Sequence, residues 1–504
     1  MPRGREAGFQ SFPLYHIRKE DIHWQRTTCG PKTTCLSVVH LWLYKYSSSF
    51  TTDKAKVRRS TFHNVVRPFF RYHQIIDIVG ENNDTNLLKE LALVSHSFLQ
   101  ICNKHLFATI ELHDAVPRYH IASSKRGFLK LLKNRPSVVK YIRKLTYREE
   151  YKNPNLLEDD RILFPFLPDF LRTIPRLNCL AITTSQSLAW DEMDPSLISA
   201  LLHLMQLPTV NHIDISYISV PLSILTLSVN MHRLDFRHTE YDSEDDDSEE
   251  DDTEYDDDSP DIVQSEPETM PRICEFYTSQ STKLTTKLLH AKRQDGQPAF
   301  DFTDLRQLSM SLDQFQDKQN LRYLLQNSKL LEKVHFSGFG SMVLHDILSP
   351  IARTLKVLDL TVSLRPGELE GLCKQLKTMA GHYRMLKALS FKVRIDGDSD
   401  DHEETENASD MIGTTLQKLG EVLVKPGWSA LRQVSFNVSI PCCGTSREEI
   451  TKLSEELHSL PDEYPSHLSK LESVSFNYSV VASKCQVPSM TLCDTGGSWR
   501  LPEV

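Results

Sequence analysis

Apolar and polar residues alternate strictly along parts of the second half of the chain. The alternation is clearest in "LKVLDL" (355–360), "LKALSF" (386–391), "LRQVSF" (431–436) and "LESVSF" (471–476). A period of two places the apolar side chains on one face of a β-sheet. The pattern therefore predicts a strand at each stretch. One residue of each is expected at an equivalent inward position of neighbouring strands: Leu358, Leu389, Val434 and Val474.

Between these strands the apolar period changes to that of a helix. Leucine, isoleucine and methionine recur at every third or fourth position in 369–379, 412–423 and 450–460. This spacing gives each segment one apolar helical face. The sequence therefore predicts strands that alternate with helices.

Weaker copies of the strand pattern extend towards the N-terminus. They lie at 331–336, 305–310, 231–236, 210–215, 177–182 and 142–147. The L-x-x-L-x-L strand followed by a helix resembles a leucine-rich repeat, here degenerate because the spacing is irregular and the usual Asn or Cys after the strand is missing. The predicted fold class is therefore α/β, an irregular leucine-rich-repeat solenoid. An ordinary α/β domain with a parallel sheet is the alternative, and in both cases the apolar positions form core rather than a cofactor site.

A different pattern precedes the repeats, between Ile75 and Asp114. It predicts a short helix around Ile75 and Ile76, a polar turn from Gly80 to Asn86, and a second helix ending near Val94. Ser95 is expected to cap a third helix. Three short helices with this apolar content need a partner surface.

This segment closely resembles an F-box. The residues that match the family pattern are Ile75, Ile76, Leu88, Leu91, Val94, Ser95, Phe98, Leu106 and Phe107. At the start of the segment, Arg67 and Phe70 stand where the family has leucine and an acidic residue. An F-box followed by irregular leucine-rich repeats resembles the F-box proteins that are numerous in mushroom-forming fungi.

The resemblance implies a substrate receptor of a cullin–RING ubiquitin ligase without catalytic activity of its own. The matching residues would bind a Skp-family adapter, which links to the cullin scaffold, and the repeats would bind the target protein. Two alternatives stay open: a repeat scaffold with no ligase association, and an acidic chaperone or sequestering protein for basic clients.

Polar residues on the strand face opposite the core are the candidate target-binding surface. They are Asp359, Ser390, Lys392, Arg394, Ser435, Asn437, Ser475 and Asn477. The sequence contains no P-loop, no G-x-S-x-G and no H-E-x-x-H motif, so neither catalytic residues nor a cofactor are expected. Gly338, in "GFGSM", is expected to form a turn.

Composition limits the class of protein. The chain has 504 residues, of which 39% are hydrophobic and 25% charged, as is usual for a soluble globular protein. The ten cysteines show no C-x-x-C spacing, so a metal site is not expected. Without a long apolar stretch, neither membrane insertion nor a secretory signal is expected, which points to the cytoplasm or nucleus. No nucleic-acid partner is expected.

Acidic residues are concentrated in two runs. Residues 238–271 contain 17 Asp or Glu and no Lys or Arg, and without them the net charge changes from −9 to +8. A second run covers 396–406. Both follow predicted strands directly, which predicts acidic loops on one rim that attract a possibly basic target. Ser243 and Ser248 are candidate phosphorylation sites.

The expected organisation has six parts. They are a poorly defined segment (1–66), F-box-like helices (67–114), a first repeat region (140–237), a disordered acidic insertion (238–271), a second repeat region (300–481) and a C-terminal tail (482–504).

Overall fold

The computed structural model describes most of the region between residues 66 and 483. The described ranges are 66–82, 84–113, 125–149, 166–239, 262–263, 270–338, 343–363, 368–395, 408–424, 426–441, 447–463 and 474–483. The chain divides into two compact units, Met1–Cys102 and Asn103–Val504. Each is described by itself. Ser243, Ser248, most of the acidic run 238–271 and the whole run 396–406 lie outside the described residues.

Helices make up the described part of the first unit. These are α2 (Val66–Glu81), α3 (Thr85–Ala92) and the start of α4 (His96–Leu106). The side chain of Asp84 accepts a hydrogen bond from the backbone N–H of Leu87 and so caps α3. Ser95 Oγ accepts from the N–H of Phe98 at 3.2 Å, which confirms the expected cap of α4. The buried side chains here are Ile76, Val79, Leu88, Ile101 and Cys102.

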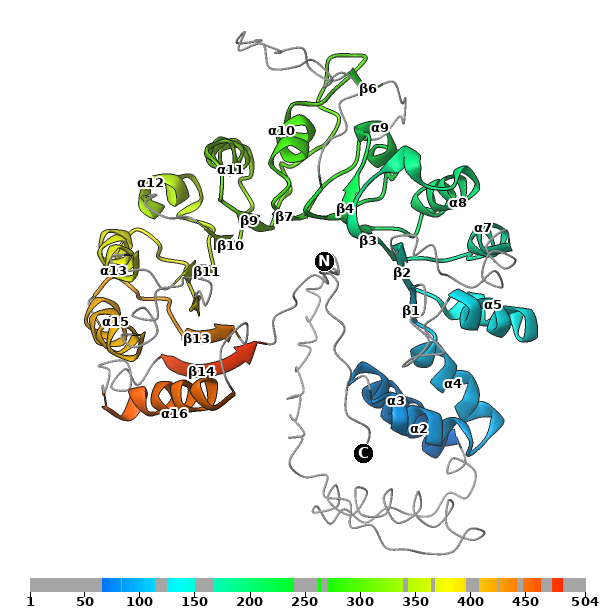
Figure 1. Cartoon of the computed structure of the whole chain (residues 1–504), viewed down its shortest axis with the longest axis horizontal. Helices are drawn as coiled ribbons and strands as arrows, with labels where there is room; N and C mark the ends of the chain where they lie inside the picture. Colours follow the sequence, from blue (N-terminus) through cyan, green and yellow to red (C-terminus); the bar gives the residue numbers. More distant parts are fainter. Residues whose placement is uncertain are drawn as a thin grey trace, which may run out of the picture. The chain divides into compact units, whose positions relative to one another are not determined.

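The second unit contains one open parallel sheet whose strands follow one another in chain order (Figure 1). In the described residues it has twelve strands: β1 (Thr109–Leu112), β2 (Lys144–Glu149), β3 (Cys179–Ala189), β4 (His212–Ser219), β5 (Arg233–Arg237), β7 (Glu275–Ser279), β9 (Gln307–Ser311), β10 (Lys333–Ser337), β11 (Val357–Ser363), β12 (Ala388–Arg394), β13 (Gln433–Pro441) and β14 (Ser475–Ser483). Two short strands, β6 (Ile262–Val263) and β8 (Lys292–Arg293), pair separately. The predicted α/β class is confirmed, and the sheet is parallel. Because the strand order never reverses, the sheet has no switch point of the kind that binds ligands in doubly wound folds.

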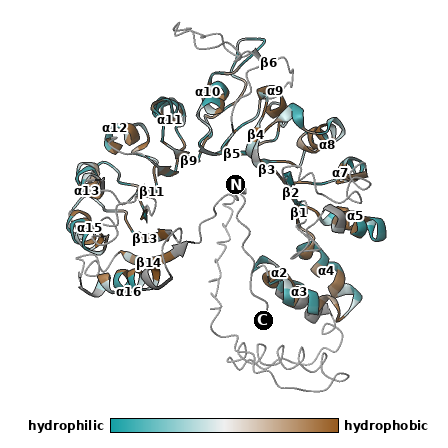
Figure 2. Ribbon diagram, viewed as in Figure 1, coloured by the Kyte–Doolittle hydropathy of each residue, from teal (hydrophilic) through white to brown (hydrophobic). Residues whose placement is uncertain are grey.

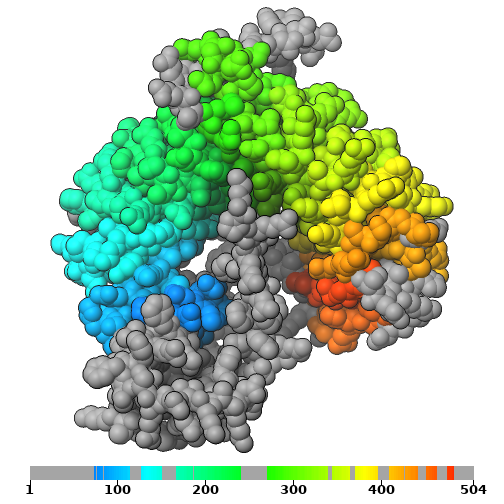
Figure 3. Space-filling model, turned by 180° about the vertical axis from the view of Figure 1, so that it is seen from behind, coloured from blue at the N-terminus to red at the C-terminus, as the bar shows by residue number. Residues whose placement is uncertain are grey.

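Helices connect the strands and lie on one face of the sheet (Figure 1). They are α5 (Lys125–Asn134), α7 (Leu167–Arg172), α8 (Pro195–Met205), α9 (Leu222–Leu225), α10 (Thr282–His290), α11 (Phe315–Asn327), α12 (Leu344–Leu348), α13 (Glu368–Met379), α15 (Ala408–Leu423) and α16 (Arg447–Glu463), with 3₁₀ turns η2 (Pro136–Tyr141), η4 (Trp190–Glu192) and η5 (Ser349–Ile351). Figure 2 shows helices with both hydrophobic and hydrophilic sides, and Figure 3 shows successive segments packed in chain order. The three helices predicted between the C-terminal strands correspond to α13, α15 and α16.

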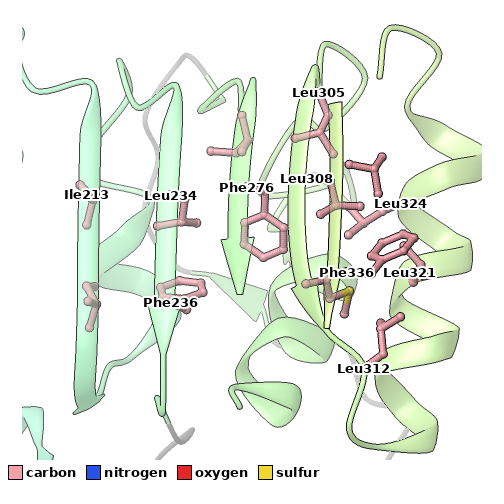
Figure 4. Close-up of a cluster of buried hydrophobic side chains, with 14 of the residues drawn as sticks. Ile213, Leu234, Phe236, Phe276, Leu305, Leu308, Leu312, Leu321, Leu324 and Phe336 are labelled. Carbon is pink, nitrogen blue, oxygen red and sulfur yellow. The ribbon is translucent and has the colours of Figure 1, made fainter. Parts of the chain in front are cut away.

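Alternating strand residues form the core between the sheet and the helices. Leu358, Leu389 and Val434 are register partners on β11, β12 and β13, as predicted, and all are at most 1% exposed. Figure 4 shows the same arrangement nearer the middle of the sheet, where Phe276 and Leu308 point to the side on which Leu321 and Leu324 of α11 lie. One face of the sheet is therefore apolar and covered by helices, and the other is polar. Parallel sheets covered on both faces instead have continuous apolar strands.

The predicted position of Val474 is wrong. Val434 pairs in register with Phe476, and Phe436 pairs with Tyr478. Strand β14 is therefore shifted by two residues relative to the "LESVSF" alignment. A shift of two keeps every side chain on its face, so alternation alone does not exclude it. The rings of Phe436 and Tyr478 stack at 6.1 Å, and the Tyr478 hydroxyl donates to the carbonyl oxygen of Leu457 at 2.8 Å.

Two strands of the sheet were not predicted. Strand β7 and helix α10 lie in the one large gap of the predicted array, and β1 lies within the segment assigned to the F-box. In β7 the third apolar position is Thr278, whose hydroxyl is 2.9 Å from that of Thr285. Threonine is tolerated in the core here because its hydroxyl has a partner. The sheet thus begins at Thr109, earlier than the predicted start of the repeats at residue 140.

Candidate functional site

The sheet face opposite the helices, here called the open face, carries the candidate functional residues. Register places open-face side chains of neighbouring strands in rows, so that Cys179, His212, Arg233, Glu275 and Gln307 follow one another from β3 to β9. A second row contains Asp214, Asp235 and Tyr277. Side chains in a row and in adjacent rows are close enough to interact.

Asp235 is the centre of an ion-pair network on strands β4 to β7. Its side chain is 3% exposed, and Arg233 donates to both carboxylate oxygens, from Nε at 3.0 Å and from Nη2 at 2.8 Å. A bidentate pair of this kind fixes both side chains. On the other side, Nε2 of His212 lies 3.3 Å from Oδ2 of Asp235, although not in line for a hydrogen bond.

The network changes the pKa values of its members. Burial by itself would raise the pKa of Asp235, but the contacts with His212 and Arg233 outweigh it, so the pKa is lowered. Burial would lower the pKa of His212, but contacts with Asp235 and the thiol of Cys179 raise it to about 9. His212 is therefore a cation at neutral pH.

The network continues onto the next two strands. The Arg233 guanidinium lies 4.2 Å from the centre of the Tyr277 ring and its Nη1 lies 3.4 Å from Glu275. The Tyr277 hydroxyl donates to Gln307 Oε1 at 3.2 Å, and Gln307 Nε2 donates to Glu275 at 3.4 Å. Arg and Tyr held this way form a pre-organised surface, of the composition common at the centres of protein interfaces.

Asp214 of β4 and Arg237 of β5 form a further ion pair on these strands. They are 3.5 Å apart, and burial raises the pKa of Asp214 although Arg237 opposes this. His212, Arg233 and Arg237 thus offset Asp214, Asp235 and Glu275. On strands β4 to β7 the open face therefore has almost no charge left for a charged partner.

Three adjacent strands carry a thiol, an imidazole and a carboxylate: Cys179, His212 and Asp235. This sequence of groups resembles that of a catalytic triad. Acyl transfer also needs N–H donors aimed at a developing oxyanion. The strand N–H groups around these residues are engaged in the parallel ladder, and Cys179 is only 8% exposed. The contacts therefore fix the positions of these side chains but do not support acyl transfer.

The predicted target-binding residues all lie on the open face, on strands β11 to β14. Lys392, Arg394, Ser475 and Asn477 are exposed, whereas Asp359, Ser390, Ser435 and Asn437 are half-buried. Asp359 lies 3.9 Å from Lys333, and Ser479 Oγ donates to Asn437 Oδ1 at 2.6 Å. The structure brings this set together on one surface.

No family model matches this sequence. A search of curated proteins gives no significant match either.

The predicted adapter-binding residues divide into buried and accessible positions. Ile76 and Leu88 are each 1% exposed, so they hold the helices together and cannot meet an adapter directly. The half-buried positions are Leu91, Val94, Phe98, Leu106 and Phe107, and Phe107 packs against the core of the second unit. Ser95 is exposed and caps α4, and the side chain of Ile75, like those of Arg67 and Phe70, lies outside the described residues.

Two kinds of residue were missed at the level of sequence. Among the side chains of these helices that the structure describes, the large apolar ones left exposed are Leu93, at 88%, and Ile78, at 47%. On the sheet, His212, Arg233 and Asp235 were missed although "VNHIDI" and "MHRLDF" place them at open-face positions. The alternation identifies their face but not their mutual contacts.

The described residues include no group of three or more His, Cys, Asp or Glu arranged to hold a metal ion. In the same part of the chain, no helix is long and apolar enough to cross a membrane.

Proposed function

We propose that this chain is a non-catalytic recognition subunit of a cullin–RING ubiquitin ligase. Its sheet unit is a degenerate leucine-rich-repeat solenoid that binds a target protein through the open face. Helices α2 to α4 act as an F-box and bind a Skp-family adapter.

The open face is the observation that carries the proposal. An all-parallel sheet normally has helices on both faces. Here the second face carries polar and charged side chains from all twelve described strands, and none of the described helices that connect these strands covers it (Figure 1). Stacked strand–helix units provide extended surfaces of this kind for binding macromolecules.

The helices of the first unit support the adapter part of the proposal. Leu93 directly follows α3, and its side chain is 88% exposed. The next residue, Val94, is half-buried. An exposed leucine beside the buried side chains of short helices is suited to insertion into an apolar groove of a partner.

Affinity purification of the tagged full chain tests the proposal. The Skp-family adapter and the cullin are expected to co-purify with the wild-type protein. Leu93→Asp should abolish their recovery, because it places a charge in the proposed contact. The fold should be kept, because this side chain is already exposed. Val94→Asp should have the same effect on binding but also destabilise the helices.

Asn86→Asp is the matched control. It adds the same charge at an exposed polar position of α3 and should leave adapter recovery unchanged. A wild-type chain that folds but never recovers the adapter would exclude the ligase role and favour a scaffold that uses the open face alone.

A further inference from the structure

The residues that directly precede five neighbouring strands lie in one row. They are Arg306, Glu332, Lys356, Lys387 and Arg432, before β9 to β13. From Glu332 on, each donates its backbone N–H to the carbonyl oxygen of the previous member, at 2.7–2.9 Å. Neighbouring strands are ~4.8 Å apart, so four cations line one edge of the sheet within reach of a single extended segment.

Glu332 is the one acidic member of this strand-start row. Lys356 Nζ lies 2.6 Å from its carboxylate, and this hydrogen bond lowers the pKa of Glu332. The charges of Arg306 and Lys387 lower it further, so these cations gather around a single carboxylate. Among the described residues, no carboxylate is within ion-pair distance of Arg306, Lys387 or Arg432.

The positive charge continues onto the open face beside the row. Lys392 and Arg394 of β12 are exposed, and Lys333 of β10 shares only the 3.9 Å contact with Asp359. Burial lowers the pKa of His335; the charge of Asp359 opposes this, and the charges of Lys392 and Lys333 lower the pKa further. These three cations together with the strand-start row are here called the basic surface.

The basic surface differs from the neighbouring part of the open face. On β4 to β7, three cations are offset by three carboxylates in close contact. On the basic surface, seven cations face Glu332 and Asp359. Unpaired charge is therefore concentrated where the target-binding residues were expected.

We propose that the basic surface binds a carboxylate-rich segment of the target protein, laid across strands β9 to β13. The inference rests on the proposed recognition function and specifies the chemistry of its partner. Carboxylates form charge-assisted hydrogen bonds with Lys and Arg, and serines such as Ser309, Ser390 and Ser435 leave room for a peptide backbone between the cations.

The side chains favour a peptide over a nucleic acid. Binding of single strands relies on aromatic side chains that stack with the bases. From β9 to β13, the described open-face positions include no Phe, Tyr or Trp. The basic surface thus favours an acidic partner, whereas the acidic runs favour a basic one.

Fluorescence anisotropy with a labelled polyglutamate peptide tests this inference on the full chain at low salt. The double variant Lys387→Glu/Lys392→Glu should weaken binding about tenfold or more. The control, Arg322→Glu/Lys377→Glu, makes the same change in net charge at exposed positions of α11 and α13 and should change binding less than about twofold. Lys392→Ser provides a milder variant if the double variant does not fold.

Equal weakening by both double variants would overturn the inference, because net charge alone would then explain binding. Tighter binding of a labelled single-stranded RNA than of polyglutamate would also overturn it. Recovery of the adapter should be the same in both variants. If Lys387→Glu/Lys392→Glu abolishes capture of the target but leaves polyglutamate binding intact, the recognition function stands and the acidic-segment inference fails.

Discussion

Individual strand residues have opposite roles depending on the face they occupy. Leu389 is 1% exposed in the core, whereas its neighbour Ser390 lies on the open face. Leu389→Ala should lower the free energy of unfolding by ~2–5 kcal/mol because it leaves a cavity. Ser390→Ala should change it by less than ~0.5 kcal/mol. Urea denaturation measures both, and equal losses would contradict the alternation.

His212 gives the protein a predicted pH dependence. Its pKa is raised from 6.5 to about 9 in the folded state. Folding therefore favours the protonated form, and this stabilisation is fully present below pH 6.5 and lost as the pH rises through about 9. The difference in unfolding free energy between wild type and His212→Gln should shrink over this interval.

Asp235→Asn is the companion variant for this measurement. It keeps the shape of the side chain but removes the charge that holds His212 protonated. It should therefore also flatten the pH dependence of the free energy of unfolding. A difference between wild type and His212→Gln that is constant with pH would show that the ion pair does not stabilise the fold.

Neighbouring helices are joined by buried polar contacts. Thr282 of α10 donates to Asp317 Oδ1 of α11 at 2.7 Å, and both side chains are buried. Oδ2 of the same carboxylate accepts from the N–H of Gln314 in the capping box of α11. The contact therefore aligns the start of one helix with the next.

Thr282→Val should lower the free energy of unfolding by ~1–3 kcal/mol, because the buried carboxylate loses a donor that water cannot replace. Thr378→Val, at an exposed position of α13 where the hydroxyl bonds the carbonyl oxygen of Gln375, should cost less than ~0.5 kcal/mol. Thermal or urea unfolding of the two variants compares them directly, and equal costs would argue against an alignment role.

The whole molecule combines a basic surface on the sheet with acidic segments elsewhere in the sequence. Excision of residues 240–258 should leave the melting temperature almost unchanged, since loop length costs only ~0.6 kcal/mol per doubling. If the target segment is carboxylate-rich, its association should become faster at low salt, and the difference should shrink at high salt. Stopped-flow mixing with labelled polyglutamate measures this. Slower association of labelled polylysine after the same excision would instead support the basic target predicted from the acidic runs.

At this scale the sequence by itself determined most of the strand order and the face of each residue in the predicted strands. Periodicity does this because a side chain on a strand has only two directions to point. Ten of the twelve described strands of the sheet were predicted in this way. Strand β7 was missed because Thr278 replaces the third apolar residue, and its hydroxyl is satisfied only once α10 brings Thr285 beside it.

Tertiary structure alone decided the register of β14 and the contacts of the open face. Alternation permits any even shift, and packing of Tyr478 against Phe436 and Leu457 fixes one of them. Likewise, Arg233 and Glu275 are 42 residues apart in the sequence, and they meet because β5 and β7 become neighbours. A pattern read along one strand contains no information about which charges the next strand places beside it, and these neighbours decide whether a charge is paired or available to a partner.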